Sequence, residues 1–347
     1  FGMNKKTVFL ALGLTLAAIV FWELHWRSEG YPIAPEDDKH LYAEHRASIE
    51  KLGKDDVVLL GSSRVLFDFQ LDEFESVTGR RPVMLAAAGS NPIAALKDIV
   101  ENSKFSGKII LGITPPLYFS PPTMDQFFFR RAQKLLDHYH KRTWADRWTH
   151  TVKKPFQNTF AFLTASPESF YNELDPRTLL EWKIKLPVRV PGEPPFPMFQ
   201  YLDWDRNVTM WRADTDPEYA KMVTEVWKDA VNVPPEALPP PEVIEEGRKG
   251  TIAMTVGLVK AFEERGGQVI FVRCPSSDLF LDIESKAFPR NMYFDQLVGQ
   301  SGSYGYHFQD YPFMNKYTPP EWSHLNTRDA KQFTLDVAAQ MLKDGAL

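Results

Sequence analysis

The chain has 347 residues, of which 44% are hydrophobic and 24% charged, and its net charge at pH 7 is −5. This length holds one large domain or two small ones around a sizeable apolar core. A slightly acidic balance argues against a nucleic-acid-binding surface, so we expect no nucleic-acid partner. The single cysteine, Cys274, excludes an intramolecular disulfide and ends an apolar run. We expect it to be a small buried side chain without a catalytic role.

The N-terminal segment is expected to cross a membrane. Lys5 and Lys6 precede an uncharged run over residues 7–22, and Leu24 and Trp26 extend it to the roughly 20 residues that span a bilayer. A cleavable signal peptide is the alternative, but no small-x-small cleavage site with a polar start follows, and there is no lipobox cysteine. We favour an uncleaved single-pass anchor in the inner (cell) membrane. Positive charge before the span predicts a cytoplasmic N-terminus and a periplasmic, or otherwise extracytoplasmic, main domain.

The next part of the chain alternates between strands and helices. Residues 28–55 form a predicted linker and amphipathic helix, with Leu41, His45 and Ile49 at helical spacing. Short apolar runs then alternate with helix-compatible stretches: strands at 55–61, 82–86 and 108–112, and helices at about 65–78 and 92–104. This alternation indicates βαβ units with right-handed crossovers.

Residues 115–245 interrupt this pattern. They hold many of the 27 prolines and of the aromatic residues that make up 13% of the chain, with a helical patch at 124–148 and proline clusters at 187–197 and 233–241. Such composition is typical of sugar- or interface-facing surfaces, or of a loop-rich segment with a small core of its own. We favour the second interpretation. Because an α/β pattern follows, the segment is predicted to be an insertion and not a separate domain.

The α/β pattern resumes with a helix at 243–265, a fourth strand at 268–273, a loop-rich stretch and a closing helix at 327–343. The predicted fold class is α/β, a doubly wound parallel sheet. The expected parts are a cytoplasmic tip and anchor (1–27), a linker and helix (28–55), the first half of the domain (56–114), the insertion (115–245) and the second half (246–347).

Functional groups of open α/β sheets gather at the carboxyl ends of the strands. Polar residues follow the predicted strands at 61–64, 88–92, 112–115 and 273–276, and a further polar segment, 321–326, precedes the last helix. A nucleophilic serine needs a tight strand-to-helix turn, a base and backbone N–H donors. Ser62 or Ser63 meets the first condition and His324 the second. Taken alone, Gly-Ser-Ser is a weak signal, because serines frequently cap helices.

The order of these segments resembles the SGNH (GDSL-like) hydrolases. Gly61-Ser62-Ser63 is similar to their first block, with Ser63 in the nucleophile position and Ser62 as the alternative nucleophile. Gly89 corresponds to the glycine that supplies an oxyanion donor. The segment from Glu321 to His324 resembles their late Asp-x-x-His, with His324 as base and Glu321 as its acid. The resemblance implies the SGNH fold and is greatest to membrane-anchored members that take part in cell-envelope or exopolysaccharide O-acylation.

Two departures from the family pattern affect the predicted site. The third-block asparagine is absent, because residues 112–115 contain none. Asn91 or the Thr114 hydroxyl is the expected substitute as an oxyanion donor. The usual aspartate is replaced by Glu321, whose carboxylate must still reach the imidazole Nδ1–H of His324.

Other polar residues have weaker claims to a role. Arg64 and Arg273 either bind an anionic substrate group or pair with a nearby carboxylate. His138 and His140 are two residues apart and on a helix point to different faces. We therefore expect no metal site there, and no cofactor.

The resemblance implies an extracytoplasmic O-acyltransferase or esterase that acts on a cell-envelope or secreted polysaccharide through Ser63, His324 and Glu321. A membrane-bound O-acyltransferase, or another integral membrane complex, is the implied partner. The alternative is a non-catalytic accessory or scaffold subunit that keeps the fold, favoured by the two departures and by an insertion suited to docking.

Overall fold

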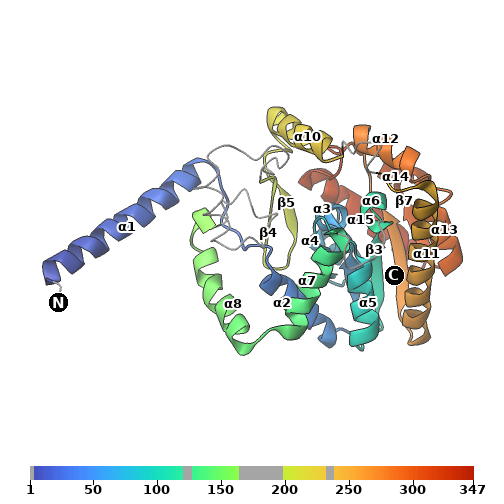
Figure 1. The fold of residues 1–347 in the computed structure, drawn as a ribbon, viewed down its shortest axis with the longest axis horizontal. Coiled ribbons are helices and arrows are strands. Elements are labelled where there is room, and N and C mark those ends of the chain that lie inside the picture. The colour runs from blue at the N-terminus through green and yellow to red at the C-terminus, as the bar shows by residue number, and fades with distance from the viewer. Residues whose placement is uncertain (1–3, 120–126, 164–197, 232–237) are drawn as a thin grey trace.

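The computed structural model describes residues 4–119, 127–163, 198–231 and 238–347, and its centre is a parallel sheet (Figure 1). The strands are β1 (Val57–Leu60), β2 (Val83–Met84), β3 (Lys108–Gly112), β6 (Gln268–Arg273) and β7 (Tyr304–His307). Their order across the sheet is β2-β1-β3-β6-β7, and every neighbouring pair is parallel. In chain order this is 2-1-3-4-5, the arrangement of flavodoxin-like doubly wound folds. The predicted α/β class is confirmed.

Alternation along the strands divides the apolar side chains between two cores. Leu59 and Ile110 belong to one core, whereas Val58 and Ile109 belong to the other, as expected when successive side chains point to opposite faces. The first core is covered by α3 (Ser63–Asp68), α4 (Leu71–Thr78) and α15 (Thr327–Lys343). The second is covered by α5 (Ile93–Asn102), α11 (Pro241–Glu264) and α13 (Phe294–Ser301). The sheet is therefore the middle layer of three.

The segment between β3 and β6 packs on both sides of this sheet. Before α11, its described elements are α6 (Pro115–Tyr118), α7 (Phe127–Lys141), α8 (Trp144–Gln157), the short helix η2 (Ala161–Leu163), the antiparallel hairpin β4 (Gln200–Leu202) and β5 (Val208–Met210), and α10 (Pro217–Val231). Phe129 and Leu136 of α7 join the core that contains α5. Met210 of the hairpin and Val223 of α10 join the core that contains α15. The predicted proline cluster at 187–197 lies outside the described residues.

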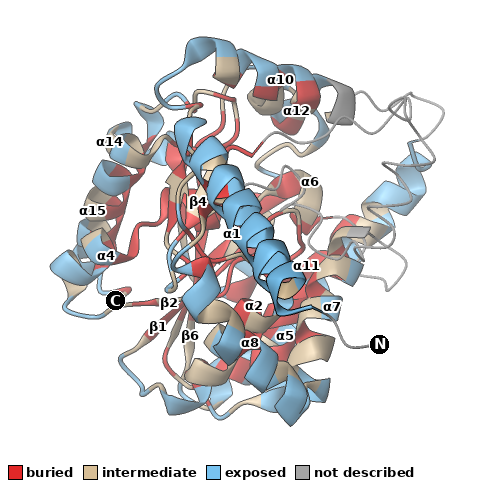
Figure 2. Cartoon of the chain, turned by 90° about the vertical axis from the view of Figure 1, so that its left-hand side faces the viewer, coloured by how far each residue is buried: buried red, intermediate tan, exposed pale blue. Residues whose placement is uncertain are grey.

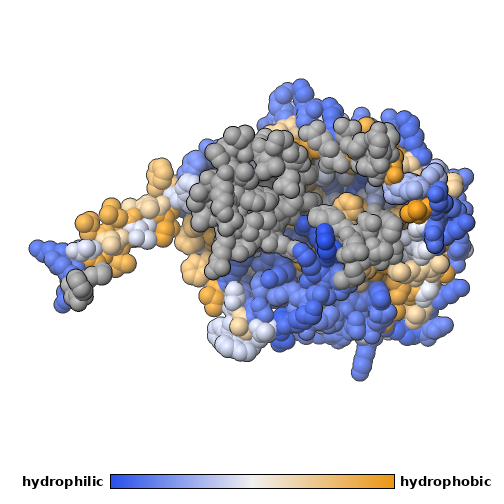
Figure 3. Space-filling model, viewed as in Figure 1, coloured by the Kyte–Doolittle hydropathy of each residue, from blue (hydrophilic) through white to orange (hydrophobic). Residues whose placement is uncertain are grey.

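Helix α1 (Lys5–Ser28) projects from the domain (Figure 1). It has 24 residues. Among the helices of the described residues, it is the one that is long and apolar enough to cross a membrane. Most of its residues are exposed (Figure 2), and hydrophobic residues lie along the face of the helix that Figure 3 shows. After it come α2 (Lys39–Ser48) and the short helix η1 (Ile49–Lys51).

Several elements differ from the sequence prediction. The helix predicted at 65–78 is two helices, because the Gln70 N–H donates to the Thr334 hydroxyl of α15 and its side-chain amide donates to the Val208 carbonyl of the hairpin. The helix predicted at 124–148 ends at Lys141, and a capping box at Thr143 starts α8. The loop-rich stretch after β6 contains α12 (Asp278–Ala287), α13, β7, η5 (Phe308–Asp310) and α14 (Pro312–Asn315). Cys274 is buried, as predicted.

Candidate active site

The first candidate residues lie where β1 turns into α3. A side chain at Gly61 would meet the Val65 Cγ2 at 2.4 Å, so only glycine allows the helix to start this close to the strand. Ser62 is buried, and its Oγ lies 2.6 Å from the Thr114 Oγ1, with which it shares a hydrogen bond. Ser63 is the half-buried first residue of α3, and its hydroxyl has no hydrogen-bond partner within the part of the chain that the structure describes.

Glu321 and His324 form a tight, buried acid–histidine turn before α15. The Glu321 Oε1 accepts hydrogen bonds from the backbone N–H of His324 (2.6 Å) and of Ser323 (3.3 Å), and lies 2.9 Å from the His324 Nδ1. Trp322 between them has φ +74°, a left-handed conformation that costs energy in a residue other than glycine. The longer glutamate side chain therefore reaches the imidazole, as the predicted role requires.

The other imidazole nitrogen of His324 is available. Its Nδ1 faces the Glu321 carboxylate, which makes Nδ1–H the donor and leaves Nε2 with its lone pair. The Nε2 atom is buried and has no hydrogen-bond partner among the described residues. An unpaired buried polar atom costs free energy and is uncommon in proteins. In this tautomer Nε2 is able to accept a proton, which is the property that the predicted role of His324 requires.

Helix α3 runs alongside this turn and brings Ser63 toward it. The Arg64 Nε donates to the Ser323 Oγ at 3.3 Å, and the Asp68 Oδ1 accepts from the Leu325 N–H at 3.0 Å. The Phe67 ring stacks on the His324 ring, with centroids 4.3 Å apart. Because Ser63 precedes Phe67 by four residues, it lies on the same helix face, about 5.4 Å along the axis.

The helix that carries Ser63 therefore packs against the turn that carries His324, and the two side chains are not hydrogen-bonded in the described residues. Hydrogen bonds between a nucleophile and its base are frequently long before substrate binds. The structure brings Glu321 and His324 into contact and places Ser63 at the start of α3, the helix that packs against their turn.

Trp227 of α10 is a site residue that the sequence prediction missed. Its Nε1–H donates to the Glu321 Oε2 at 2.6 Å, so both oxygens of the carboxylate are bonded. The Phe199 ring also lies beside the His324 ring, at 5.8 Å between centroids. The segment between β3 and β6 therefore contributes directly to the candidate site. Only the aromatic enrichment of that segment pointed to it in the sequence.

The three predicted oxyanion donors differ in whether their hydrogen-bonding groups are already bonded within the protein. Gly89 has φ +60°, and its N–H is without a hydrogen-bond partner in the described ranges. The Asn91 Nδ2 donates to the Leu117 and Tyr118 carbonyls, both at 3.0 Å, so Asn91 fastens α6 to the loop after β2. Thr114 holds Ser62. Gly89 and the Ser63 N–H at the start of α3 are thus the available donors.

Arg64 and Arg273 pair with the same buried carboxylate. The Arg64 Nη2 lies 2.6 Å from the Glu284 Oε1, and the Arg273 guanidinium binds the other oxygen of Glu284. The Ser276 hydroxyl also donates to Glu284, at 2.9 Å. Of the two predicted roles, anion binding or pairing with a carboxylate, the structure shows the pairing for both arginines. The cluster joins α3, β6 and α12.

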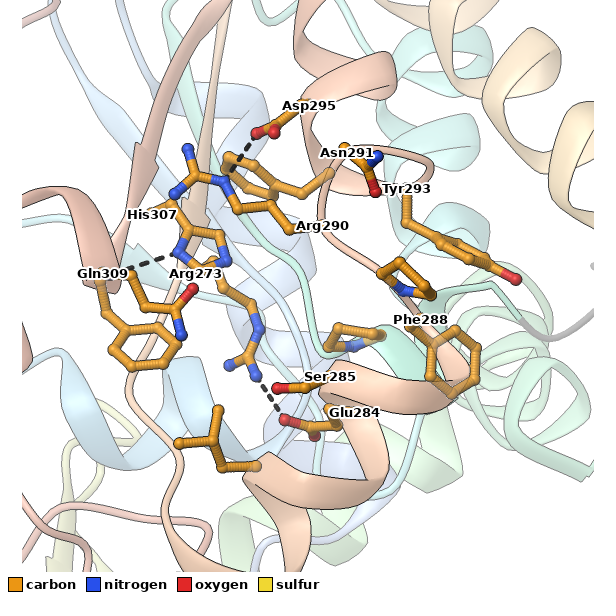
Figure 4. A pocket seen from close by; sticks show the side chains of 15 residues that line it. Arg273, Glu284, Ser285, Phe288, Arg290, Asn291, Tyr293, Asp295, His307 and Gln309 are labelled. Carbon is orange, nitrogen blue, oxygen red and sulfur yellow. Dashed lines mark hydrogen bonds and ion pairs between the residues drawn. The ribbon is translucent and has the colours of Figure 1, made fainter.

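Two members of this cluster also line a cavity of about 400 Å³ (Figure 4). Arg273 and Glu284 line it together with His307 and Arg290, and Arg290 binds Asp295 and Asp310. Burial lowers the pKa of His307 to about 3, with the charges of Arg273 and Arg290 acting in the same direction, so this imidazole is neutral at neutral pH. Neither Ser63 nor His324 lines this cavity.

The two histidines of α7 have different partners, as predicted. The His138 Nε2 lies 3.1 Å from the His40 Nδ1, whereas the His140 Nε2 lies 2.5 Å from the Asp98 Oδ1. His40, His138 and Asp146 are the described residues best placed to hold a metal ion, with ligand atoms within 4.8 Å of one another. However, one imidazole of the pair donates to the other, and the Asp146 Oδ2 accepts from the Thr143 N–H at 2.7 Å.

The chain matches no protein-family model and no curated protein sequence. The function proposed below depends on the geometry of this site and on the order of the motifs in the sequence.

Proposed function

We propose that this protein is a membrane-anchored, extracytoplasmic O-acyltransferase or esterase of the SGNH hydrolase type. The observation that carries the proposal is the Glu321–His324 pair, in which Nδ1 is fixed at 2.9 Å from the carboxylate and the buried Nε2 has no partner within the described residues. The flavodoxin-like strand order and the exposed apolar helix α1 are compatible with it.

In the proposed mechanism the His324 Nε2 removes the Ser63 proton while the Ser63 Oγ attacks the carbonyl carbon of an acyl donor. The Gly89 and Ser63 N–H groups donate to the oxyanion, and Glu321 stabilises the imidazolium. The imidazolium then returns its proton to the departing alcohol, which leaves an acyl group on Ser63. A sugar hydroxyl, or water, deprotonated by His324 then takes the acyl group, and the Ser63 hydroxyl is restored.

The anchor favours transfer to a polysaccharide over simple hydrolysis. An acyl group used outside the cytoplasm has to come from across the bilayer, and a membrane-bound O-acyltransferase would supply it. A protein held at the membrane by α1 is placed to receive the group there. The acceptor in this proposal is a cell-envelope or secreted polysaccharide.

The test is hydrolysis of a chromogenic acetyl ester by the full-length protein in detergent, beside Ser63→Ala and His324→Ala. We expect each variant to lose activity by at least about 1,000-fold, because nucleophile and base act as one unit. Ser62→Ala is the matched control, since its hydroxyl bonds Thr114 and not His324, and should retain most of the activity. Equal activity in wild type, Ser63→Ala and His324→Ala would overturn the assignment, and loss in Ser62→Ala alone would move the nucleophile to Ser62.

A second candidate function is that of a non-catalytic accessory subunit of a membrane complex. It is favoured by the missing hydrogen bond between Ser63 and His324 in the described residues, and by the position of the 400 Å³ cavity away from both. Purification of the full-length protein with its membrane partners separates the two. A complex that transfers acyl groups with wild-type protein and with Ser63→Ala alike supports the accessory role.

A further inference from the structure

Helix α8 presents large apolar side chains to the outside of the molecule. Trp144, Trp148, Val152 and Phe156 are 75%, 61%, 52% and 53% exposed. They are spaced by four residues, so they form one stripe along the helix, about 18 Å long. We call these four residues the α8 stripe. Single exposed apolar residues are ordinary, but a continuous row of this size marks a surface that something covers.

The inward face of α8 is polar. The buried His150 Nε2 lies 2.8 Å from a carboxylate oxygen of Glu44 on α2, and Lys154 pairs with the same carboxylate at 2.8 Å. Lys153 pairs with Asp38 at 3.0 Å, and Gln157 is buried. A surface helix of a water-soluble domain normally turns its apolar face inward and its charges outward. In α8 the large apolar side chains lie outside instead, next to the exposed Arg147, Thr149 and Thr151, which favours an environment outside the helix that is apolar in part.

The position of α8 relative to α1 identifies that environment. The Glu23 carboxylate of α1 accepts from the Ala161 N–H at 3.0 Å and from the Phe162 N–H at 3.2 Å, and Arg27 donates to the Thr159 carbonyl at 3.0 Å. These residues directly follow α8, so the base of α1 is fixed beside the C-terminal end of α8. Figures 1 and 2 show both helices on the same side of the domain, with α8 crossing the direction of α1.

We propose that α8 lies in the interface of the same bilayer that α1 spans, with the α8 stripe inserted at the boundary between headgroups and acyl chains. Tryptophan favours this zone, because its ring is apolar and its N–H is polar. The ligand of this surface is therefore the lipid bilayer itself. The inference rests on the proposed membrane anchor and extends it: α1 holds the domain at the membrane, and α8 fixes which face of the domain touches it.

The test uses the full-length protein in phosphatidylcholine nanodiscs, with an environment-sensitive fluorophore on one introduced cysteine. The native Cys274 is 2% exposed, so labelling is confined to the introduced site. Trp148→Cys and Val152→Cys probe the stripe, and Leu12→Cys in α1 reports insertion of the anchor. Met254→Cys on α11, 41% exposed, is the control for an exposed apolar position remote from α1.

We expect blue-shifted emission and quenching by spin-labelled lipid at Leu12, Trp148 and Val152, and neither effect at Met254. Quenching at Leu12 without quenching at the stripe overturns the inference and leaves the anchor standing. A blue shift at the stripe without lipid quenching also overturns it, because a protein partner or a second copy then covers α8. Absence of quenching at Leu12 itself overturns the anchor, and with it the premise of the inference.

Discussion

Asp68 is a buried residue next to the candidate site, and its carboxyl group changes protonation near neutral pH. Its Oδ1 accepts from the Leu325 N–H, and the buried Cys274 thiol lies beside the same carboxyl group. Burial raises the pKa of Asp68 to about 8, the nearby Glu321 acts in the same direction, and the Leu325 N–H and Arg64 oppose it. The carboxyl group beside the His324 turn is therefore protonated over most of the neutral range.

The first prediction concerns the stability of Asp68→Asn. Folded protein binds the Asp68 proton more tightly than the unfolded chain, whose aspartate has a pKa near 3.8. The contribution of Asp68 to the free energy of unfolding is therefore complete below that pH. It decreases as the pH rises toward about 8, by up to about 1.4 kcal/mol per pH unit. Asparagine mimics the protonated carboxyl and does not titrate. Between pH 5 and pH 8 we therefore expect the wild type to lose stability relative to Asp68→Asn. The difference in melting temperature should change by several degrees in favour of the variant.

The measurement is thermal unfolding of the full-length protein in detergent at several pH values. The exposed Asp214→Asn serves as control, and its difference from the wild type should stay constant across this range. A difference for Asp68→Asn that does not change with pH would show that Asp68 ionises normally in the folded protein.

The contact between Glu321 and His324 could be predicted from the sequence, because both belong to one short motif. The catalytic roles assigned to them and to Ser63 stay predictions. Trp227 and Asp68 could not be predicted in the same way. The Trp227–Glu321 bond joins residues 94 positions apart, and the bond of Asp68 to Leu325 spans 257 positions. Such partners depend on how helices pack over the sheet, which local patterns do not specify. The shared carboxylate of Arg64 and Arg273, Glu284, was missed for the same reason.

At the scale of secondary-structure elements, α10 supports the candidate site from outside the main sheet. Its Val223 and Val226 are buried in the core that contains α15, and Trp227, the next residue, bonds Glu321. Trp227 is a positioning residue in the proposed mechanism, because it contacts the acid and not the substrate.

The second prediction is that Trp227→Phe lowers kcat by about tenfold and leaves KM unchanged. The phenyl ring keeps most of the packing but removes the N–H donor to the Glu321 Oε2. Hydrogen bonds to charged groups contribute about 1.5–3 kcal/mol, and a loss of 1.36 kcal/mol from the transition state is a tenfold loss of rate. Steady-state ester hydrolysis by the full-length protein measures both constants.

Trp211→Phe is the matched control for this variant. The Trp211 Nε1–H donates to the Gly30 carbonyl at 3.3 Å, so the control also loses one indole hydrogen bond, but not one to Glu321. Equal losses of kcat in the two variants would assign the effect to general destabilisation and remove the positioning role of Trp227.

The strands that are buried on both faces of the sheet are the elements that the sequence predicted best. Strands β3 and β6 match the predicted ranges, because they lie inside the sheet and their apolar runs are continuous. Strand β7 was missed: it is an edge strand, its sequence is Tyr-Gly-Tyr-His, and its first residue is exposed. The breaks between α3 and α4 and between α7 and α8 come from side-chain hydrogen bonds that periodicity does not reveal.

At the scale of the whole molecule, the domain is attached to α1 by a specific contact and not only by a linker. Glu23 is 8% exposed although it lies on a helix whose other side chains are mostly exposed. Its carboxylate bonds two backbone N–H groups after α8 and pairs with Arg27 at 2.6 Å. Tyr31 also packs between Trp26 and Trp211, with centroids 4.8 and 4.7 Å apart. We therefore expect α1 to hold one direction relative to the domain.

The last prediction is that Glu23→Ala loosens this direction without releasing the protein from the membrane. The substitution leaves the Ala161 and Phe162 N–H groups without their acceptor and Arg27 without its partner, whereas the apolar run of α1 is unchanged. Spin labels at Leu12→Cys and Met254→Cys in nanodiscs measure the distance between α1 and α11. We expect a narrow distance distribution in the otherwise native protein and a broader one after Glu23→Ala. Glu29→Ala, which removes an exposed carboxylate from the end of the same helix, should leave it narrow, and equal widths in all three would show that the Glu23 contact does not orient the domain.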